Sequence, residues 1–382
     1  MFEWSLTEQV LLGILAVVWL YQLYFYLRYM LAAARATRPA KEQPSADVRP
    51  GVSVIVCARN EHANLCDYLQ ALLTQDYPQY EVIVVDDGSE DDTRLMVERW
   101  QKRYTNLKLT FVPIGAHVMS TKKLAITLGA KAAQYDYLLL TDADCRPEST
   151  HWIATMVTGF MQPGGQIDIV LGAGMYFVKP GLLNRMIQFD TLFNAMQYLG
   201  MSQCGHPYMG VGRNLAYSKR LFFAQHGFAG ILEHRAGDDD LFVNRVATKQ
   251  NTAVVCTRES LTWSVPKASL GEWLRQKRRH LSVAPAYRTA TKVRLTLEPF
   301  SRGMLYALAI ALLVLASWEI RLGVVAALLI RWIMQVLIIN TAASRWGTTK
   351  VILLLPLWEV LLPLITLVTL LIEPLRPKPK RW

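Results

Sequence analysis

The sequence Leu138-Leu139-Leu140-Thr141-Asp142-Ala143-Asp144-Cys145 is an apolar run that ends in two carboxylates one residue apart. A short apolar run of this kind predicts a buried strand. Because side chains alternate along a strand, Asp142 and Asp144 are expected to project to the same side. Two such carboxylates need a cation between them or a shared proton, and oxygen ligands suit Mg²⁺ or Mn²⁺. The alternative is a solvated turn, because Asp is common at strand ends.

The composition favours a globular domain joined to membrane segments. Hydrophobic residues make up 52% of the 382-residue chain and charged residues only 19%, which is more apolar than most soluble proteins. The net charge is +11, and much of the excess flanks apolar segments, which favours an anionic membrane surface as a partner. We find no nucleic-acid-binding signature and expect no nucleic acid partner. Five cysteines without a CxxC pair fit a reducing, cytosolic setting.

Four long apolar segments predict membrane-embedded helices. The first, Gln9–Leu27, has acidic residues before it and basic residues after it, which predicts a retained anchor with its N-terminus outside. The others are Met304–Trp318, Leu322–Asn340 and Val351–Ile372. Three C-terminal spans would place the basic tail outside, whereas basic residues next to membrane segments normally lie on the cytoplasmic side. Either this chain departs from that preference, or one segment is a half-span or lies in the interface. Arg331 would cost about 2.5–3.5 kcal/mol at a helix centre and is expected to face protein or water.

Between the membrane segments, strand and helix patterns alternate, which predicts an α/β fold with a mostly parallel sheet under helices. Strands are expected at Val52–Cys57, Tyr80–Val85, Leu107–Val112, Tyr135–Leu140 and Ile167–Met175. Helices are expected at Leu65–Leu73, Thr93–Tyr104, Thr121–Ala133, Trp152–Met161, Leu182–Met201 and Ser269–Leu281. The predicted division is a membrane anchor at 1–35, a linker at 36–50, a cytoplasmic α/β domain at 51–265, amphipathic interface helices at 266–302 and membrane segments at 303–382. The helix at 182–201 fits either the membrane surface or packing on the sheet.

Polar residues follow three of the predicted strands. They are the clusters Arg59-Asn60-Glu61, Asp86-Asp87-Gly88 and Asp142-Ala143-Asp144. Ligands bind beyond the carboxyl ends of strands in sheets of this kind, so the three clusters are expected to share one edge. The chain has no GxGxxG after the first strand and no GxxxxGK[ST]. A dinucleotide oxidoreductase and a P-loop NTPase are therefore disfavoured.

Two later segments carry further charge. Gly237-Asp238-Asp239-Asp240 places three acids at a predicted helix start, where one acid would satisfy the helix dipole at about 0.3–1 kcal/mol. At least one of the three is therefore expected to have another task. Ser269–Leu281 predicts an amphipathic basic helix whose charged face meets headgroups or phosphate, although a plain interfacial helix has the same composition.

These motifs resemble those of membrane-integrated family 2 glycosyltransferases, the group with hyaluronan, cellulose and chitin synthases, dolichyl-phosphate sugar transferases and ceramide glucosyltransferase. The resemblance covers residues 52–282 by motif and the flanking segments by architecture. VSVIVCARNE with VIVVDDGSEDDT matches the nucleotide-binding opening, TDADC the metal-binding Asp-x-Asp, GDDDLFVNRV the general-base motif and RQKRRH the Gln-x-x-Arg-Trp motif. The implied fold is GT-A, a Rossmann-like α/β domain, with one N-terminal and about three C-terminal transmembrane segments and amphipathic interface helices.

The resemblance implies a role for each matching residue. Asp239 would be the general base, while Asp142 and Asp144 would hold a divalent cation, Mn²⁺ or Mg²⁺. Asp142 would also contact the donor, and Asp87 would bind the uracil of a UDP-sugar. The implied donor-binding set further includes Arg59, Glu61, Lys123, Gln276 and Arg279, with Lys122 as an alternative to Lys123 beside the diphosphate. Candidates for the acceptor side are Gly212, Arg213, Asp238 and His280, of which His280 stands where the family has Trp.

The activity that this resemblance implies is inverting transfer of a sugar from a nucleotide-diphosphate donor to a lipid or lipid-linked acceptor at the cytoplasmic membrane face. The alternative is a processive polysaccharide synthase that exports its polymer, but the small number of spans and the missing Trp favour single transfer. A receptor or scaffold with an inactive transferase domain is disfavoured by the intact acids. The expected partners are the donor, the acceptor and membrane lipids, without an obligatory protein partner. The expected location is a bacterial inner membrane.

Overall fold

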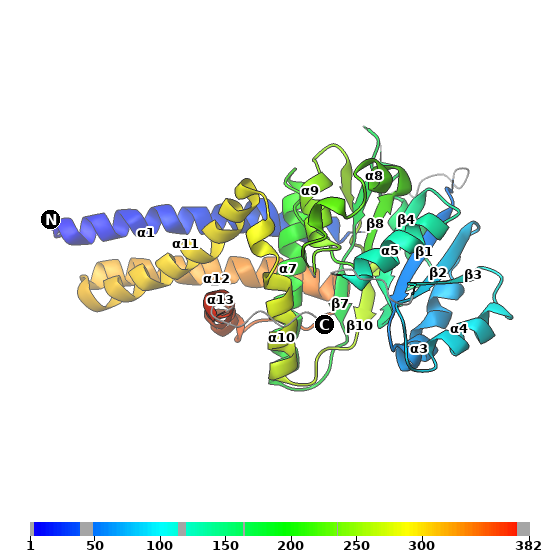
Figure 1. Cartoon of the computed structure of the whole chain (residues 1–382). Coiled ribbons are helices and arrows are strands. Elements are labelled where there is room, and N and C mark those ends of the chain that lie inside the picture. Colours follow the sequence, from blue (N-terminus) through cyan, green and yellow to red (C-terminus); the bar gives the residue numbers. More distant parts are fainter. Residues whose placement is uncertain (1–3, 39–48, 114–119, 163–164, 235, 373–382) are drawn as a thin grey trace.

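The computed structural model describes residues 4–38, 49–113, 120–162, 165–234 and 236–372. An α/β domain lies at one end, and an elongated bundle of apolar helices projects from it (Figure 1). The architecture is a mixed, mostly parallel sheet with helices on both faces, as the sequence predicts.

The main sheet has the strand order β3-β2-β1-β4-β8-β6-β9. The strands are β1 (Val52–Ala58), β2 (Tyr80–Asp86), β3 (Leu107–Phe111), β4 (Tyr137–Asp142), β6 (Ile169–Leu171), β8 (Leu215–Ser218) and β9 (Thr252–Val254). The first four strands of the sheet are parallel, and β8 runs antiparallel to both β4 and β6. Register pairs Cys57 with Asp142 and Ala58 with Asp86, so the polar ends of β1, β2 and β4 are aligned at one edge.

A second sheet, ordered β5-β10-β7, lies beyond this edge. It contains β5 (Cys145–Pro147), β7 (Gly174–Tyr176) and β10 (Thr262–Ser264). The prediction of a single strand at 167–175 is wrong, because β6 and β7 belong to different sheets. The predicted strand is interrupted at Gly172. A β-carbon on this residue would lie 2.5 Å from Cγ of Asn214. The Asn214 amide fills this space and donates to the carbonyl oxygen of Ala173 at 2.9 Å.

Helices cover both faces of the main sheet. They are α3 (His62–Leu73), α4 (Thr93–Gln101), α5 (Thr121–Ala132), α6 (Trp152–Val157), α8 (Lys219–Ala224) and α9 (Asp240–Val246). Alternate residues of β1 belong to two separate cores, because Ile55 packs with α5 while Val54 and Val56 pack with α3 and α6. A strand buried on both faces reads as a continuous apolar run, which explains the sequence VSVIVCA.

Three helical segments are long and apolar enough to cross a membrane. The first is Leu6–Ala36, in which α1 (Leu6–Phe25) and α2 (Leu31–Ala36) are joined by a π-helical turn, η1 (Tyr26–Met30). The others are α11 (Thr289–Leu315) and α12 (Trp318–Trp346). The third predicted C-terminal segment forms the shorter helix α13 (Leu355–Ile372), which Figure 1 shows end-on, across the direction of the bundle. The basic tail lies outside the described residues.

Two helices lie between the sheet and the bundle: α7 (Leu182–Gln203) and α10 (Leu270–Leu281). As one of the two alternatives for the first helix predicts, α7 packs on β7 and β9, and it also packs on α2 and η1 of the first apolar segment. Gly200 permits this packing, since a β-carbon there would lie 2.0 Å from the carbonyl oxygen of Tyr29. The basic helix α10 begins with a capping box, in which Ser269 and Glu272 satisfy each other's backbone N–H groups.

Candidate active site

The ends of β1, β2 and β4 bring charged groups around Cys57. Burial raises the pKa of its thiol, and the charges of Lys122, Asp142, Asp238 and Asp87 all act on it. These four residues come from α5, β4, the segment before α9 and the end of β2. Residues far apart in the sequence therefore share one edge of the sheet. Cys57 itself is a small packing group whose raised pKa keeps the thiol neutral at pH 7.

Lys122 lies at the centre of this cluster. Its Nζ is 2.9 Å from Oδ1 of Asp142 and 3.3 Å from Oδ2 of Asp238. Burial of Lys122 acts to lower its pKa, but these carboxylates and Asp239 outweigh burial and hold the pKa well above its usual value. Lys122 is therefore a fixed positive charge between the strand-end carboxylates and the acids before α9.

Asp142 and Asp144 form a carboxylate pair. Their oxygens and Sγ of Cys145 all lie within 4.8 Å of one another. Burial acts to raise the pKa of Asp142, but the charge and hydrogen bond of Lys122, together with the charges of Arg213 and Arg279, outweigh burial and lower the pKa overall. The pKa of Asp144 is raised by burial and by the charge of Asp142. Two carboxyl groups this close repel each other when both are ionised, and a cation between them would allow both to lose their protons.

The donor set of this pair fits a hard divalent cation. Asp142 and Asp144 offer oxygen atoms, which are the ligands that Mg²⁺ and Mn²⁺ prefer. Burial raises the pKa of the Cys145 thiol well above its usual value, and the two carboxylates raise it further. Cys145 is therefore a neutral thiol, which donates to Oδ1 of Asp144 at 3.4 Å.

The acids before α9 form a turn that faces Lys122. Asp239 accepts the backbone N–H of Gly212 at 2.7 Å on Oδ2 and that of Asp240 at 2.8 Å on Oδ1. Burial and the adjacent Asp238 raise the pKa of Asp239 above its ordinary value. A carboxylate with a raised pKa is a better proton acceptor once ionised.

The third acid of the turn is held from behind. Burial, with the charge of Asp239, raises the pKa of Asp240 to about 8. The hydroxyl of Tyr287 donates to Oδ2 of Asp240 at 2.8 Å, and the backbone N–H of Leu241 donates to Oδ1 at 2.7 Å. Asp240 therefore anchors the turn, while Asp238 and Asp239 face the cluster.

The second sheet holds Arg213, which lies in the loop just before β8. The guanidinium of Arg213 donates to the carbonyl oxygen of Gly174 at 3.1 Å and to Oγ of Ser264 at 3.0 Å. It also stacks 4.4 Å from the ring centre of Tyr176. The Tyr176 hydroxyl in turn accepts a hydrogen bond from Gln276 of α10 at 2.7 Å. These contacts join α10 to the edge of the carboxylate cluster.

The last turn of α10 places two more groups at the cluster. The positive charge of Arg279 acts on Asp142, so its guanidinium lies within electrostatic reach of the carboxylate pair. Desolvation lowers the pKa of His280, and the positive charges of Arg279, Arg213 and Lys122 lower it further. The His280 side chain lies at the solvent-exposed end of α10.

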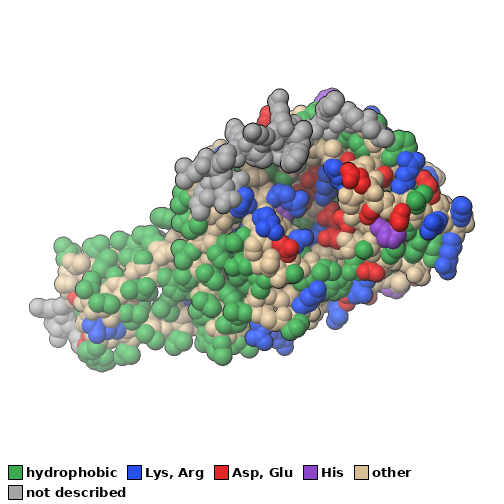
Figure 2. Space-filling model, turned by 60° about the horizontal axis from the view of Figure 1, so that its bottom comes forward, with side chains coloured by type: hydrophobic (Ala, Val, Ile, Leu, Met, Phe, Trp, Pro, Cys, Tyr) green, Lys and Arg blue, Asp and Glu red, His purple; other side chains and the backbone are tan. Residues whose placement is uncertain are grey.

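Figure 2 shows acidic and basic side chains gathered around a hollow of the α/β domain, while the surface of the bundle is largely hydrophobic. A model of one protein family, described as glycosyl transferase family 21, matches residues 14–376. The chain belongs to glycosyl transferase family 21. This family is of the family 2 type that the motifs resemble, so the chain is a glycosyltransferase enzyme.

Curated relatives match part of the transferase. Glycosyltransferase AglE of Haloferax volcanii is 28% identical over 178 residues, which cover 46% of this chain and 53% of AglE. A poly-beta-1,6-N-acetyl-D-glucosamine synthase of Staphylococcus epidermidis is 31% identical over 94 residues, which cover 25% of this chain and 22% of the synthase. The transferase thus spans about half of one relative and about a fifth of the other.

A solved structure supports the fold over nearly the whole chain. The mannosyltransferase PcManGT from Pyrobaculum calidifontis, in complex with GDP-Man and Mn²⁺, has a TM-score of 0.54 and 22% identity. The alignment covers 88% of the transferase and 99% of PcManGT. At this identity the likeness concerns the fold, which is GT-A-like as predicted.

Three further candidates lie at the β1 and β2 ends of the transferase cleft. Burial raises the pKa of Asp87 against a hydrogen bond from Thr121 and the charge of Arg59. Glu61 accepts a hydrogen bond from Asn64 at 2.6 Å, and burial with the charges of Asp144 and Asp142 raises its pKa. The structure therefore places Asp87 and Glu61 at the same edge as the carboxylate pair. Arg59 is exposed.

Lys123 donates its hydrogen bonds to backbone carbonyls, although the charges of Asp238, Asp239 and Asp240 also act on it. Its side chain is 1% exposed, and Nζ donates to the carbonyl oxygens of Ile231 at 2.7 Å and Ala236 at 2.9 Å, as well as to that of His234. Adjacent residues of a helix point in different directions, so only one of the two lysines can face the carboxylates. In this structure Lys122 contacts the carboxylates, while Lys123 holds the segment before the acidic turn.

Sequence reasoning missed the groups that support the site from other elements. The Tyr176 hydroxyl accepts a hydrogen bond from Gln276, and the Tyr287 hydroxyl donates one to Asp240. Asp190 of α7 forms an ion pair with Lys277 of α10 at 2.6 Å. No local sequence pattern predicts the role of these residues, because that role depends on tertiary contacts. The one available signal was the charge of Lys277 on the less exposed side of an amphipathic helix.

Proposed function

We propose that this transferase moves a sugar from a nucleotide-diphosphate donor, expected to be a UDP-sugar, to a lipid or lipid-linked acceptor with inversion of the anomeric centre. The observation that carries the proposal is Lys122, which joins the carboxylate pair to the acidic turn in one cleft. The two motifs that donor activation and proton removal require thus lie on either side of one ammonium group.

Donor binding is assigned to the strand-end edge. Asp142 and Asp144 would hold a divalent cation, Mn²⁺ or Mg²⁺, which supplies positive charge to the diphosphate when bound. PcManGT, which shares the fold, binds Mn²⁺ together with GDP-Man, and this supports the assignment of a cation. Lys122 and Arg279 add fixed positive charge to the leaving group, while Asp87 and Glu61 line the nucleoside side. Arg59 and Gln276 are assigned to the rim of the donor site.

Proton removal is assigned to Asp239. An acceptor hydroxyl must lose its proton while it attacks the anomeric carbon on the face opposite the diphosphate, which inverts that centre. The two backbone N–H groups that Asp239 accepts fix its carboxylate, and its raised pKa strengthens it as a base. Gly212, which donates one of these bonds, keeps the space beside Asp239 open. Asp238 holds Lys122 in place.

The acceptor is assigned to the membrane side. The basic helix α10 and the sheet-packed α7 lie between the cleft and three helices long enough to cross a membrane. A water-soluble donor and a lipid acceptor can both reach this boundary. A site here holds the two substrates next to each other, although one comes from water and the other from the membrane. His280 and Arg213 are assigned to this side of the cleft. The α/β domain is expected in the cytoplasm.

A second candidate function is processive synthesis of a polysaccharide. The name of the Staphylococcus epidermidis relative favours it, over 94 aligned residues. Against it, polar side chains and packed apolar groups join α1, α11, α12 and α13 within the described residues. We therefore rank single transfer first, and product length separates the two.

The test is a screen of UDP- and GDP-sugars with membranes that contain the full-length chain, in Mn²⁺ or Mg²⁺. The expected result is nucleotide release with label appearing in the lipid extract as a product of fixed size. A ladder of polymer lengths would favour the processive alternative. Nucleotide release that is equal in wild type and Asp239→Asn would contradict the proposed base.

A further inference from the structure

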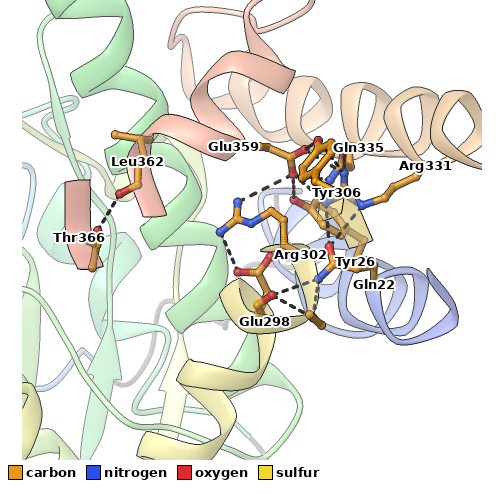
Figure 3. Close-up of polar contacts among 11 residues, drawn as sticks. Gln22, Tyr26, Glu298, Arg302, Tyr306, Arg331, Gln335, Glu359, Leu362 and Thr366 are labelled. Carbon is orange, nitrogen blue, oxygen red and sulfur yellow. Dashed lines mark hydrogen bonds and ion pairs between the residues drawn. The ribbon is translucent and has the colours of Figure 1, made fainter. Parts of the chain in front are cut away.

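A cluster of buried polar side chains lies inside the membrane helices of this enzyme (Figure 3). It contains residues from α1, η1, α11, α12 and α13, which we call the membrane network: Gln22, Tyr26, Glu298, Arg302, Tyr306, Arg331, Gln335 and Glu359. Two arginines and two glutamates balance its charge. Arg331, which was predicted to face protein or water, is 2% exposed and faces protein.

Glu359 is the point at which the network converges. Arg331 donates to it with both terminal nitrogens, at 2.9 Å and 3.0 Å. Gln335 donates at 2.6 Å, Tyr306 at 2.9 Å and Tyr26 at 3.1 Å. These donors come from α12, α11 and η1, so a single carboxylate of α13 is bound by every other membrane segment of the described chain.

Glu359 is also the one charged residue within α13, whose sequence is LPLWEVLLPLITLVTLLI. The threonine hydroxyls give no second anchor, because Thr366 donates to the carbonyl oxygen of Leu362 and Thr369 to that of Ile365, both within the helix. An apolar helix in an apolar medium has many equivalent rotations and positions. A single saturated polar contact selects one of them.

Further contacts of α13, made by its apolar side chains, lead to the active site. Trp358 and Leu362 are 3% and 7% exposed and belong to the same core as Trp273 of α10. The helices α10 and α13 pack directly on each other, as do α13 and α7. Three residues beyond Trp273, Gln276 contacts the Tyr176 hydroxyl at the cleft. The position of α13 is therefore transmitted to α10 through side-chain packing.

We propose that Glu359 is a positioning residue for the donor site: the membrane network fixes α13, and α13 seats α10 so that Gln276 and Arg279 face the donor diphosphate. This inference rests on the proposed function in that α10 contacts the donor. With α10 seated before the donor binds, no binding energy is spent on ordering the helix. Loss of the network should therefore weaken donor binding while the protein stays folded.

An apolar replacement separates positioning from stability. Buried ion pairs exchanged for apolar residues of similar size often leave stability unchanged or raised, whereas removal of one partner strands a buried charge. The main variant is therefore Arg331→Leu with Glu359→Leu, and Glu359→Gln is the milder change. The matched control is Trp19→Phe, which removes the hydrogen bond from Trp19 to the carbonyl oxygen of Ala327 at 2.8 Å, in a separate cluster of membrane helices without α13 residues.

The first measurement is calorimetric binding of UDP with Mn²⁺ to the full-length chain in lipid nanodiscs. We expect the double variant to bind UDP about tenfold more weakly at unchanged stoichiometry, at the low end of the losses caused by outer-shell positioning residues. Glu359→Gln should show a smaller loss and Trp19→Phe none. A purely structural role would instead lower the stoichiometry at unchanged affinity, and that result would overturn the proposal.

The second measurement is hydrogen exchange of Leu270–Leu281, read by mass spectrometry in the same nanodiscs. The double variant should exchange faster in this segment while β1 and β4 keep their protection, and unchanged exchange would overturn the proposal. Arg279→Ala separates the two levels of the argument. If Arg279→Ala binds UDP like the wild type, the proposed donor role of α10 fails. If it weakens binding and the double variant does not, the positioning role fails.

Discussion

Two clusters of oppositely charged side chains occupy this transferase, and they differ in how completely they are satisfied. In the cleft, the side chains of Lys122 and Asp142 are 37% and 32% exposed and share one contact. In the membrane network, Arg331 and Glu359 are 2% and 1% exposed, and the carboxylate accepts hydrogen bonds from every side. Similar chemical groups thus serve two purposes.

The difference shows where ligand binding is possible. A saturated, buried carboxylate has no remaining capacity for a ligand, and its value lies in the arrangement that it selects. A half-exposed carboxylate pair keeps oxygen atoms free for a cation, at the cost of mutual repulsion that raises the pKa of Asp144. The cleft is therefore arranged to bind and release ligands, whereas the membrane network is arranged to hold its helices in one fixed position.

The largest effect is expected from Asp239→Asn. Loss of a general base typically lowers the rate by about 10²–10⁴, and the amide cannot accept the acceptor proton. UDP binding should stay within about twofold of wild type, because Asp239 is assigned to the acceptor side of Lys122. Rates of labelled transfer and calorimetric binding on the same preparation test this prediction. Parallel loss of both would mean that the acidic turn holds the donor instead.

Loss of the carboxylate pair comes next. Asp142→Asn with Asp144→Asn should lower the rate by about 10²–10³, the typical effect of removing charge stabilisation at a leaving group. A chelator should lower the wild type to a similar level and leave the double variant unchanged. Rates measured with and without added Mn²⁺ check both statements. An additive effect of chelator and variant would place the cation elsewhere.

Lys122→Met should have a smaller effect, about 10- to 100-fold on kcat/KM, because a hydrogen bond to a charged group contributes about 1.5–3 kcal/mol. The matched control is Lys123→Met, which alters the neighbouring lysine. If Lys122 acts on the donor, its variant should weaken UDP binding, whereas Lys123→Met should mainly lower the melting temperature by releasing the segment at Ile231. The reverse pattern would restore Lys123 as the donor-site lysine.

The smallest effect is a shift in pH dependence from Asp238→Asn. The charge of Asp238 is the second-largest cause of the raised pKa of Asp239, and burial is the largest. The base must be ionised, so activity is lost as the pH falls through this pKa. Removing the Asp238 charge lowers the pKa of Asp239, and the acid limb of the kcat/KM profile should move to lower pH. A shift to higher pH would contradict the assignment of Asp238 as a group that raises the pKa of Asp239.

Much of the fold was predictable because local signals and burial agree. Apolar runs predicted β1, β2, β3 and β4, and the polar clusters at the ends of β1, β2 and β4 predicted the edge at which the charged groups meet. The strand at 167–175 was predicted wrongly, since periodicity cannot reveal that Asn214 inserts at Gly172 and divides the segment between two sheets.

The candidate site was predictable to the level of segments and less so to single side chains. The motif around Asp142 gave the carboxylate pair, but the choice between Lys122 and Lys123 depends on the direction in which α5 presents each residue. The partners Tyr287 and Glu359 act across long sequence separations, at 47 residues from Asp240 and 28 from Arg331. Such contacts become visible only after the chain is folded.

The stereochemistry of transfer tests the account most directly, because a single displacement with Asp239 as base inverts the anomeric carbon. Proton NMR of the first product formed from an α-linked nucleotide sugar should show a β-linkage, with no α-product at early times. An α-linked first product would require a covalent intermediate or front-face attack, and either would contradict the roles assigned to Asp239 and the carboxylate pair.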